Sequence, residues 1–244
     1  MKSTAAIEFI RDHTDFTTSE FADALYKQSP QMARSTIYQI LRNLCEEGEI
    51  TRTSRGHFSI SRIEDYSYPL SNTGKEIASF ISKSYPLVTF QIWELYQMNE
   101  FVNHQISRNT VFVEVETMHD ESVFNLLFEN YPHVLLNPTK EEYYRYSGKE
   151  TIVVKKIISE APPSYGEMKQ ATLEKILVDL FARGISGSII SKSEYPAIYE
   201  DSFKRYHINQ PKMFRYARRR GIEGKIRTFI HEQTSINLDE TICL

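Results

Sequence analysis

Apolar and polar positions follow their clearest pattern between residues 29 and 60. Apolar side chains recur there at the helical spacing i, i+3, i+4 and i+7, at Ile37, Ile40, Leu41 and Leu44. This spacing predicts an amphipathic helix that packs one face on a core, and Gly48 suits its end as a left-handed cap. Residues 50–60 then predict two short strands with a basic turn near Arg55. A helix followed by a basic hairpin is typical of the second half of a winged helix-turn-helix.

Two shorter helices are predicted ahead of this segment. The pattern places one near residues 5–11 and the other near residues 19–26. Thr17 or Thr18 is expected to cap the second helix, and Glu20 is placed to close a capping box on Thr17. These elements supply the first half of the same winged helix-turn-helix.

The other face of the predicted recognition helix is polar. Its hydroxyl, phenol, amide and guanidinium groups can hydrogen-bond base edges and phosphates. Together with the hairpin, the residues expected to bind DNA are Ser35, Thr36, Tyr38, Gln39, Arg42, Arg55 and His57. The alternative is a solvated face in a small α+β domain, but the full order of elements favours DNA binding.

From residue 88 the pattern changes to strands that alternate with helices. Four strands are predicted, over residues 88–93, 110–116, 133–136 and 151–158. Short helices connect the last three, which predicts a small, mainly parallel sheet. Further helices are predicted towards the carboxyl end, over residues 172–181, 194–206, 211–220 and 222–233.

The expected fold class is therefore α+β with two domains. Residues 1–63 form the winged helix-turn-helix domain, and residues 64–87 form a connector. Residues 88–233 form an α/β domain with a small, mainly parallel sheet and carboxyl-terminal helices. Residues 234–244 are expected to be a tail.

Composition indicates the structural class and the compartment expected for the protein. At 244 residues, 41% hydrophobic and 25% charged, the chain has ample material for a globular core. Cys45 and Cys243 are its only cysteines, so neither a disulfide framework nor a cysteine metal site is expected. The first residues contain no long apolar run, and no stretch reaches the length of a membrane span. We expect a cytoplasmic protein with no membrane partner.

The charges of the chain are unevenly distributed. The net charge is −3, yet residues 204–227 contain nine basic residues against one acid, Glu223. Such an excess can hold nucleic-acid backbone or an acidic protein, and the alternative is a solvated helix face. The expected basic surface consists of Lys204, Arg205, Lys212, Arg215, Arg218, Arg219, Arg220, Lys225 and Arg227.

The sequence contains no glycine-rich phosphate loop, nucleophile elbow or metal-spaced cluster of histidine and cysteine. The nearest approach to a nuclease is Glu114 and Glu116 on one predicted strand, with Lys155 and Lys156 on another. A metal-dependent nuclease of the PD-(D/E)xK kind needs a lysine two residues after the acid, where this chain has Glu116. We expect both glutamates on the solvated side of a strand near the sheet edge, with no catalytic residue, metal or cofactor.

Several segments together resemble a known family. They are STIYQILRNLCEEGEI with the TRTSRG turn, then TLEKILVDL, YHIN and RYARRR. In this combination the chain resembles the AbiEi-type antitoxins and transcriptional regulators of bacterial abortive-infection, type IV toxin–antitoxin systems. The resemblance implies an amino-terminal winged helix that represses its own operon. It also implies a carboxyl-terminal domain that counters a nucleotidyltransferase-like toxin encoded beside it.

The function expected from these observations is sequence-specific binding of double-stranded DNA at the protein's own operator, by an antitoxin-like regulator without catalytic activity. One alternative is a nuclease or nucleotide-acting enzyme that the winged helix directs to its target. The other is a transcription factor that senses a ligand in its second domain.

Overall fold

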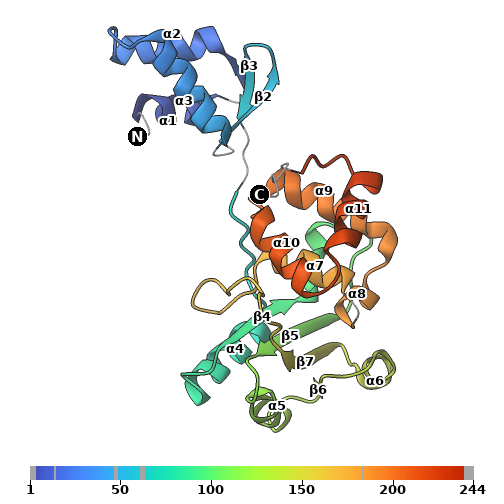
Figure 1. The fold of residues 1–244 in the computed structure, drawn as a ribbon. Helices are drawn as coiled ribbons and strands as arrows, with labels where there is room; N and C mark the ends of the chain where they lie inside the picture. Colours follow the sequence, from blue (N-terminus) through green and yellow to red (C-terminus); the bar gives the residue numbers. More distant parts are fainter. Residues whose placement is uncertain (1–3, 14, 47–48, 61–63, 183, 239–244) are drawn as a thin grey trace. The chain divides into compact units, whose positions relative to one another are not determined.

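The computed structural model describes residues 4–13, 15–46, 49–60, 64–182 and 184–238. The protein is α+β, with helices and two small sheets (Figure 1). It divides into two compact units, Met1–Glu64 and Asp65–Leu244, which are described separately. None of the helices in the described ranges is long and apolar enough to cross a bilayer.

The first unit contains three helices and a three-stranded antiparallel sheet among its described residues. The elements in chain order are α1 (Thr4–Asp12), β1 (Asp15–Thr17), α2 (Thr18–Gln28), α3 (Arg34–Glu46), β2 (Ile50–Ser54) and β3 (His57–Ile60). The strands lie in the order β1-β3-β2. Strand β1 was not predicted, because three residues carry no detectable alternation and its partner β3 lies far along the chain.

Local signals in this unit act as the sequence predicts. The apolar stripe of α3 faces the core, with Ile37, Leu41 and Leu44 buried. Thr17 and Glu20 form the predicted capping box at the start of α2, which satisfies backbone N–H groups that a helix start leaves free. The cap predicted at Gly48 lies outside the described residues.

The second unit is built on a four-stranded, mainly parallel sheet, as predicted. Its strands are β4 (Phe90–Glu94), β5 (Asn109–Val115), β6 (Val134–Leu136) and β7 (Glu150–Lys156). They lie in the order β4-β5-β7-β6, and only the β4–β5 pair is antiparallel. Helices α5 (Asp120–Phe128) and α6 (Lys140–Tyr146) connect the parallel strands.

The stretch predicted to be a connector contributes to this second unit instead. Residues 72–84 form helix α4 (Asn72–Ser84), and its residues Ile77, Ala78 and Ile81 are almost fully buried. They pack with one face of the sheet, in the same apolar cluster as Val113. An amphipathic helix of this length buries enough apolar surface to join the core.

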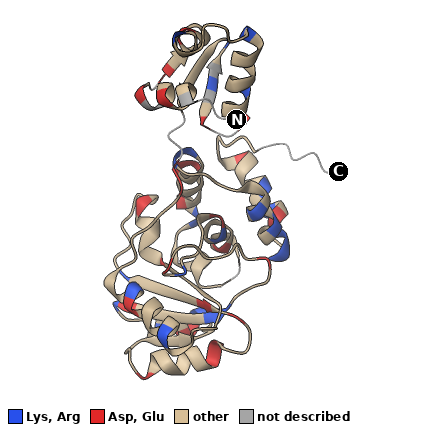
Figure 2. Ribbon diagram, turned by 90° about the vertical axis from the view of Figure 1, so that its left-hand side faces the viewer, with Lys and Arg blue, Asp and Glu red and all other residues tan. Residues whose placement is uncertain are grey.

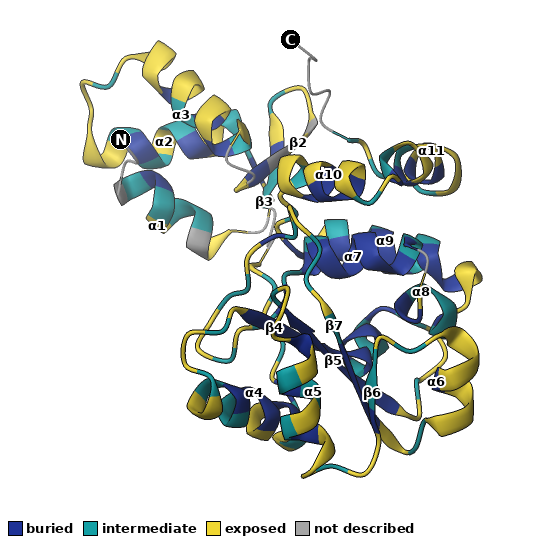
Figure 3. Ribbon diagram, turned by 60° about the horizontal axis from the view of Figure 1, so that its bottom comes forward, coloured by how far each residue is buried: buried dark blue, intermediate teal, exposed yellow. Residues whose placement is uncertain are grey.

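The other face of the sheet is covered by the carboxyl-terminal helices. They are α7 (Leu173–Phe181), α8 (Ser186–Ile189), α9 (Tyr195–Arg205), α10 (Gln210–Arg219) and α11 (Glu223–Gln233), with short 3₁₀ turns η1 (Leu95–Glu100) and η2 (Lys192–Glu194). Helix α7 is buried along almost its whole length (Figure 3). The tail predicted from residue 234 is partly packed, since Ile236 and Leu238 contact this core and Ser235 bonds to Glu200.

Candidate functional site

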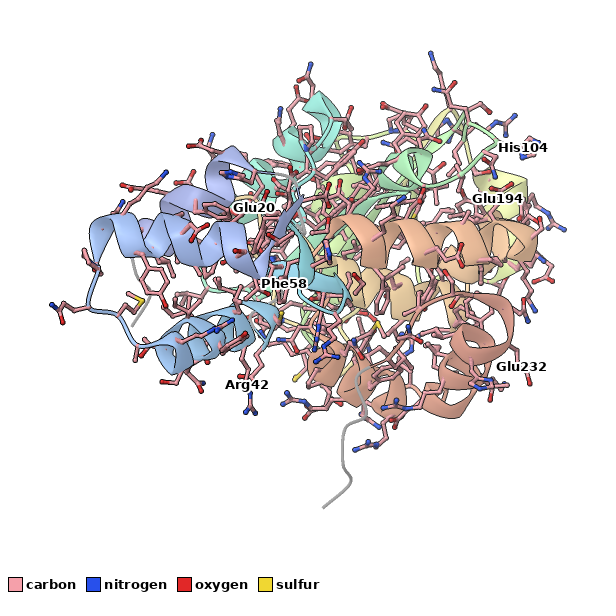
Figure 4. All side chains as sticks on the ribbon, turned by 90° about the horizontal axis from the view of Figure 1, so that it is seen from above. Glu20, Arg42, Phe58, His104, Glu194 and Glu232 are labelled. Carbon is pink, nitrogen blue, oxygen red and sulfur yellow. The ribbon has the colours of Figure 1, made fainter. Side chains whose placement is uncertain are left out.

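The polar face of α3 is exposed to solvent. Ser35, Thr36 and Gln39 are exposed, and half of the surface of Tyr38 is accessible. The side chain of Arg42 is 72% accessible and projects away from the helix (Figure 4). Its guanidinium lies 2.7 Å from Glu46 and Gln39 donates to Asn43 at 2.9 Å, both exposed contacts within the helix. Exposed pairs of this kind are weak, so these groups can exchange partners for a ligand.

The hairpin between β2 and β3 presents the remaining predicted contact residues. Arg55 and His57 are both exposed. Gly56 completes the turn with a φ of +77°, a left-handed conformation that glycine adopts without strain. The tight turn leaves the Arg55 side chain at the tip of the hairpin.

An open groove of about 990 Å³ lies between α2, α3 and the hairpin. Of the predicted residues, it brings together Tyr38, Arg42 and Arg55, while the other four do not line it. Arg34 and Arg52 also line the groove and were not predicted. Arg34, Tyr38 and Arg42 follow one another at i, i+4 and i+8, so the sequence held a signal for Arg34. Four guanidinium groups against the carboxylate of Asp23 leave the groove with an excess of positive charge, which suits an anionic backbone.

The basic surface predicted over residues 204–227 is only partly free. Arg205 pairs with Glu100, and Arg218 and Arg227 both pair with Glu223. Arg219 donates to the hydroxyl of Ser159. Neighbouring acids and a hydroxyl therefore hold several of the nine cations predicted to form this surface.

Four cations in this segment remain exposed and form no ion pair with any described residue. They are Lys204, Lys212, Arg215 and Lys225. They come from α9, α10 and α11, where basic positions recur along the ribbon in Figure 2. This smaller set is the part of the segment that can still attract an anionic partner.

Glu114 lies in a buried network of charges. It was predicted to lie on a solvated face, and that prediction was wrong. It is 1% accessible because β5 is an inner strand covered by α7. The ammonium of Lys175 lies 2.5 Å from Glu114 Oε1 and 2.6 Å from Asp179 Oδ2. Lys175 and Asp179 are one helical turn apart on α7, so both reach the same point above the sheet.

Further polar groups complete this buried network. Lys155, paired in register with Glu114 across β5 and β7, lies 3.2 Å from Glu114 Oε1. Arg220 lies 3.2 Å from Asp179 Oδ1, and Tyr216 donates to the same oxygen at 2.9 Å. Arg220 thus points inwards, unlike the surface position predicted for it. No local pattern predicted this contact, since the carboxylate partner Asp179 lies on another helix, α7.

Lys175 and Asp179 remain charged despite their burial. Burial alone raises the pKa of Asp179, but the cations around it outweigh this effect and lower the pKa to about 2. Burial alone lowers the pKa of Lys175, yet Asp179 and Glu114 raise it above its ordinary value. Both residues are therefore ionised at neutral pH, and their mutual contacts offset the cost of desolvation.

The two glutamates considered for nuclease chemistry are not brought together. Glu116 accepts a hydrogen bond from the backbone N–H of Thr89 at 3.1 Å and lies near His119, outside the network around Glu114. Each carboxylate of the network already faces an ammonium or guanidinium. No group of three or more histidine, cysteine or acidic residues is placed to hold a metal ion within the part of the chain that the structure describes.

Comparison with known proteins places the chain in a family. No curated protein matches its sequence. One family model matches residues 36–236, a span that begins within α3 and includes nearly all of the second unit. Because this match covers most of the chain, the protein belongs to the family described as a family of unknown function, DUF6577.

Proposed function

We propose that the first unit is a winged helix-turn-helix domain that binds specific sequences of double-stranded DNA, and that the protein is a transcriptional regulator acting at its own operator. The order of elements supports this assignment: α1, β1, α2 and α3, followed by the β2–β3 hairpin on an antiparallel sheet. In such domains the recognition helix enters the major groove and the hairpin contacts the backbone or the minor groove.

The observation that carries the proposal is the groove shared by α3 and the hairpin. Tyr38 and Arg42 reach it from α3, and Arg55 reaches it from the turn. A recognition surface needs both base-reading and phosphate-binding groups, and here both kinds border one open space. Arginines from both α3 and the hairpin border the same groove. If the polar face of α3 were only solvated, no such arrangement would be needed.

The polar side chains divide into two roles. Gln39 and Arg42 lie three residues apart on the exposed face of α3, and amide and guanidinium groups are those that recognise adenine and guanine in the major groove. Arg55 at the turn, with Arg52 behind it, suits phosphate oxygens. Ser35 and Thr36 at the start of α3 are placed to contact the backbone beside the recognised bases.

Selection of bound sequences from a random pool of duplex DNA tests this proposal. The full-length protein should enrich one sequence motif, and the DNA upstream of its own gene should contain it. If the affinity depends only on ionic strength and no motif is enriched, the proposal of sequence-specific recognition is overturned.

A second role, as an antitoxin, rests on the resemblance of STIYQILRNLCEEGEI, TLEKILVDL and RYARRR to AbiEi-type proteins. The exposed cations Lys212, Arg215 and Lys225 favour it, because they lie outside the proposed DNA-binding unit and form no ion pair with described residues. An acidic surface on a toxin would complement them. Expression together with the product of a neighbouring nucleotidyltransferase-like gene should restore growth, and continued toxicity would contradict this role.

A further inference from the structure

A hollow of about 260 Å³ opens beside the buried network of the second unit. It lies where the parallel strands end: Lys155 and Lys156 close β7, Glu114 is near the end of β5, and Asn137 follows β6. The space outside the carboxyl ends of parallel strands is where open α/β sheets bind ligands. Neither the proposed DNA contact nor the proposed toxin contact uses this hollow.

The charges around the hollow do not balance. The network contains three cations, Lys175, Lys155 and Arg220, against two carboxylates, Glu114 and Asp179. Lys156, on the rim, lies 3.8 Å from Asp120 and adds no further excess. A surplus charge in a largely desolvated place is unfavourable unless something compensates it.

The surplus falls on the two cations that reach the hollow. The side chains of Lys155 and Arg220 are 23% and 16% accessible, whereas Lys175 is completely buried. Lys175 is also held by both carboxylates at short range. Lys155 and Arg220 are therefore the groups whose charge remains available to a ligand.

Both cations retain free donors. The Lys155 ammonium has three N–H donors. It makes one close carboxylate contact, 3.2 Å to Glu114, and one longer contact, 3.9 Å to Asp179. Arg220 uses one nitrogen, Nη1, for Asp179 and Tyr216. Its Nη2 and Nε groups bond to no described residue. An oxyanion placed in the hollow can thus accept charge-assisted hydrogen bonds without breaking the network.

We propose that this hollow binds a small organic anion through a phosphate or carboxylate group, which supplies the missing negative charge between Lys155 and Arg220. Phe112, Val153 and Ile185 line the same space and form an apolar wall for the carbon part of the ligand. The Lys155 ammonium already lies over the Phe112 ring, 5.2 Å from its centre, so the charged and apolar parts of the site adjoin.

Calorimetric titration and thermal unfolding of the full-length protein test the proposal. The probes are inorganic phosphate and malonate, with chloride at matched ionic strength as the reference. At least one probe should bind and raise the melting temperature beyond the effect of chloride. Binding of phosphate alone would assign a phosphorylated ligand, and binding of malonate alone would assign a carboxylate. If neither differs from chloride, the proposal is overturned.

The variant Lys155→Met separates a binding role from a structural one. It removes the surplus charge and leaves the inner network neutral, so it should melt at or above the wild-type temperature in chloride. Its affinity for the active probe should fall about tenfold or more, as for loss of one charge-assisted hydrogen bond. Arg220→Met should lower the affinity for the active probe in the same way.

Lys149→Met serves as the matched control, because this exposed lysine immediately precedes the other end of β7. It should keep wild-type affinity. If Lys155→Met melts well below the wild type in chloride, Lys155 is a cation that the carboxylates require, and the proposal fails. Equal loss of affinity in Lys149→Met would also overturn it, since the effect would then be one of overall charge.

Discussion

Thr18 holds the tip of the hairpin against the start of α2 through two hydrogen bonds to Gly56. The backbone N–H of Thr18 donates to the Gly56 carbonyl oxygen at 2.8 Å, and the Thr18 hydroxyl donates to the same oxygen at 3.2 Å. Arg55, the neighbour of Gly56, is thereby kept at the groove that Arg42 lines from α3. The hairpin part of the proposed DNA-binding surface is thus held against α2 before DNA binds, which reduces the cost of binding.

Replacement of Gly56 by alanine should destabilise the first unit by about 1–2 kcal/mol, the cost of a left-handed conformation for a residue with a Cβ. The added Cβ would be 3.5 Å from Thr18 Oγ1, an ordinary contact, so the loss comes from the backbone conformation and not from a clash. Urea unfolding followed by circular dichroism measures it. Gly224→Ala, in a helix with open space around it, should instead be neutral or stabilising. Equal effects of both changes would contradict this account.

Arg55→Ala should weaken DNA binding without changing the preferred sequence. If Arg55 contacts one phosphate, its loss should flatten the slope of log affinity against log salt by about 0.9. Fluorescence anisotropy at several salt concentrations measures the slope. An unchanged slope, or a changed sequence preference, would show that the hairpin does not contact the backbone in the proposed way.

The buried network predicts how stability depends on acid. The folded pKa of Asp179 is lowered to about 2, so its contacts contribute stability above the ordinary pKa of an aspartate. This contribution should be lost as the pH falls from about 4 towards 2. Asp179→Asn should be less stable at neutral pH and should show a shallower loss over that range. Parallel curves for variant and wild type, measured by urea unfolding at each pH, would contradict the assigned role.

The exposed cations of α10 and α11 should act on a protein partner. Replacing Lys212, Arg215 and Lys225 by glutamate should abolish neutralisation of the proposed toxin in a growth assay and leave the proposed DNA binding nearly intact, since like charges across a contact are unfavourable. A control variant carries the same change in charge elsewhere in the second unit. It has glutamate in place of three exposed lysines, Lys75, Lys83 and Lys149. Both variants should fold. Full rescue of growth by the first variant would mean that this surface is only solvated.

Structural features that depend on residues close together in the chain could be predicted. The apolar stripe of α3 and the capping box of Thr17 with Glu20 depend on spacings of three and four residues. The alternation of strands and helices likewise predicted the mainly parallel sheet.

Features set by distant residues could not be predicted in the same way. Lys175 was not among the residues predicted to form a site, yet it contacts Glu114, 61 residues away in the sequence, and is completely buried. A nearly continuous apolar run around Lys175 and Asp179 was the available signal, since a helix that is apolar all round is usually buried. The inward turn of Arg220 had no such signal, because its carboxylate partner lies on another helix.

The most direct test of the account replaces the proposed base-reading residues of α3. Tyr38, Gln39 and Arg42 are changed together to alanine, and affinity for the selected motif is measured beside a shuffled duplex, with circular dichroism to verify folding. The control changes Lys27 and Gln28 to alanine, two exposed residues of α2 that do not line the groove.

Each lost base contact should cost about 1–3 kcal/mol in discrimination. The account therefore predicts that the triple variant folds, retains weak binding that depends on salt, and no longer distinguishes the motif from the shuffled duplex, while the control behaves as the wild type. A folded triple variant that still prefers the motif with wild-type affinity would contradict the central claim and show that another surface reads the DNA.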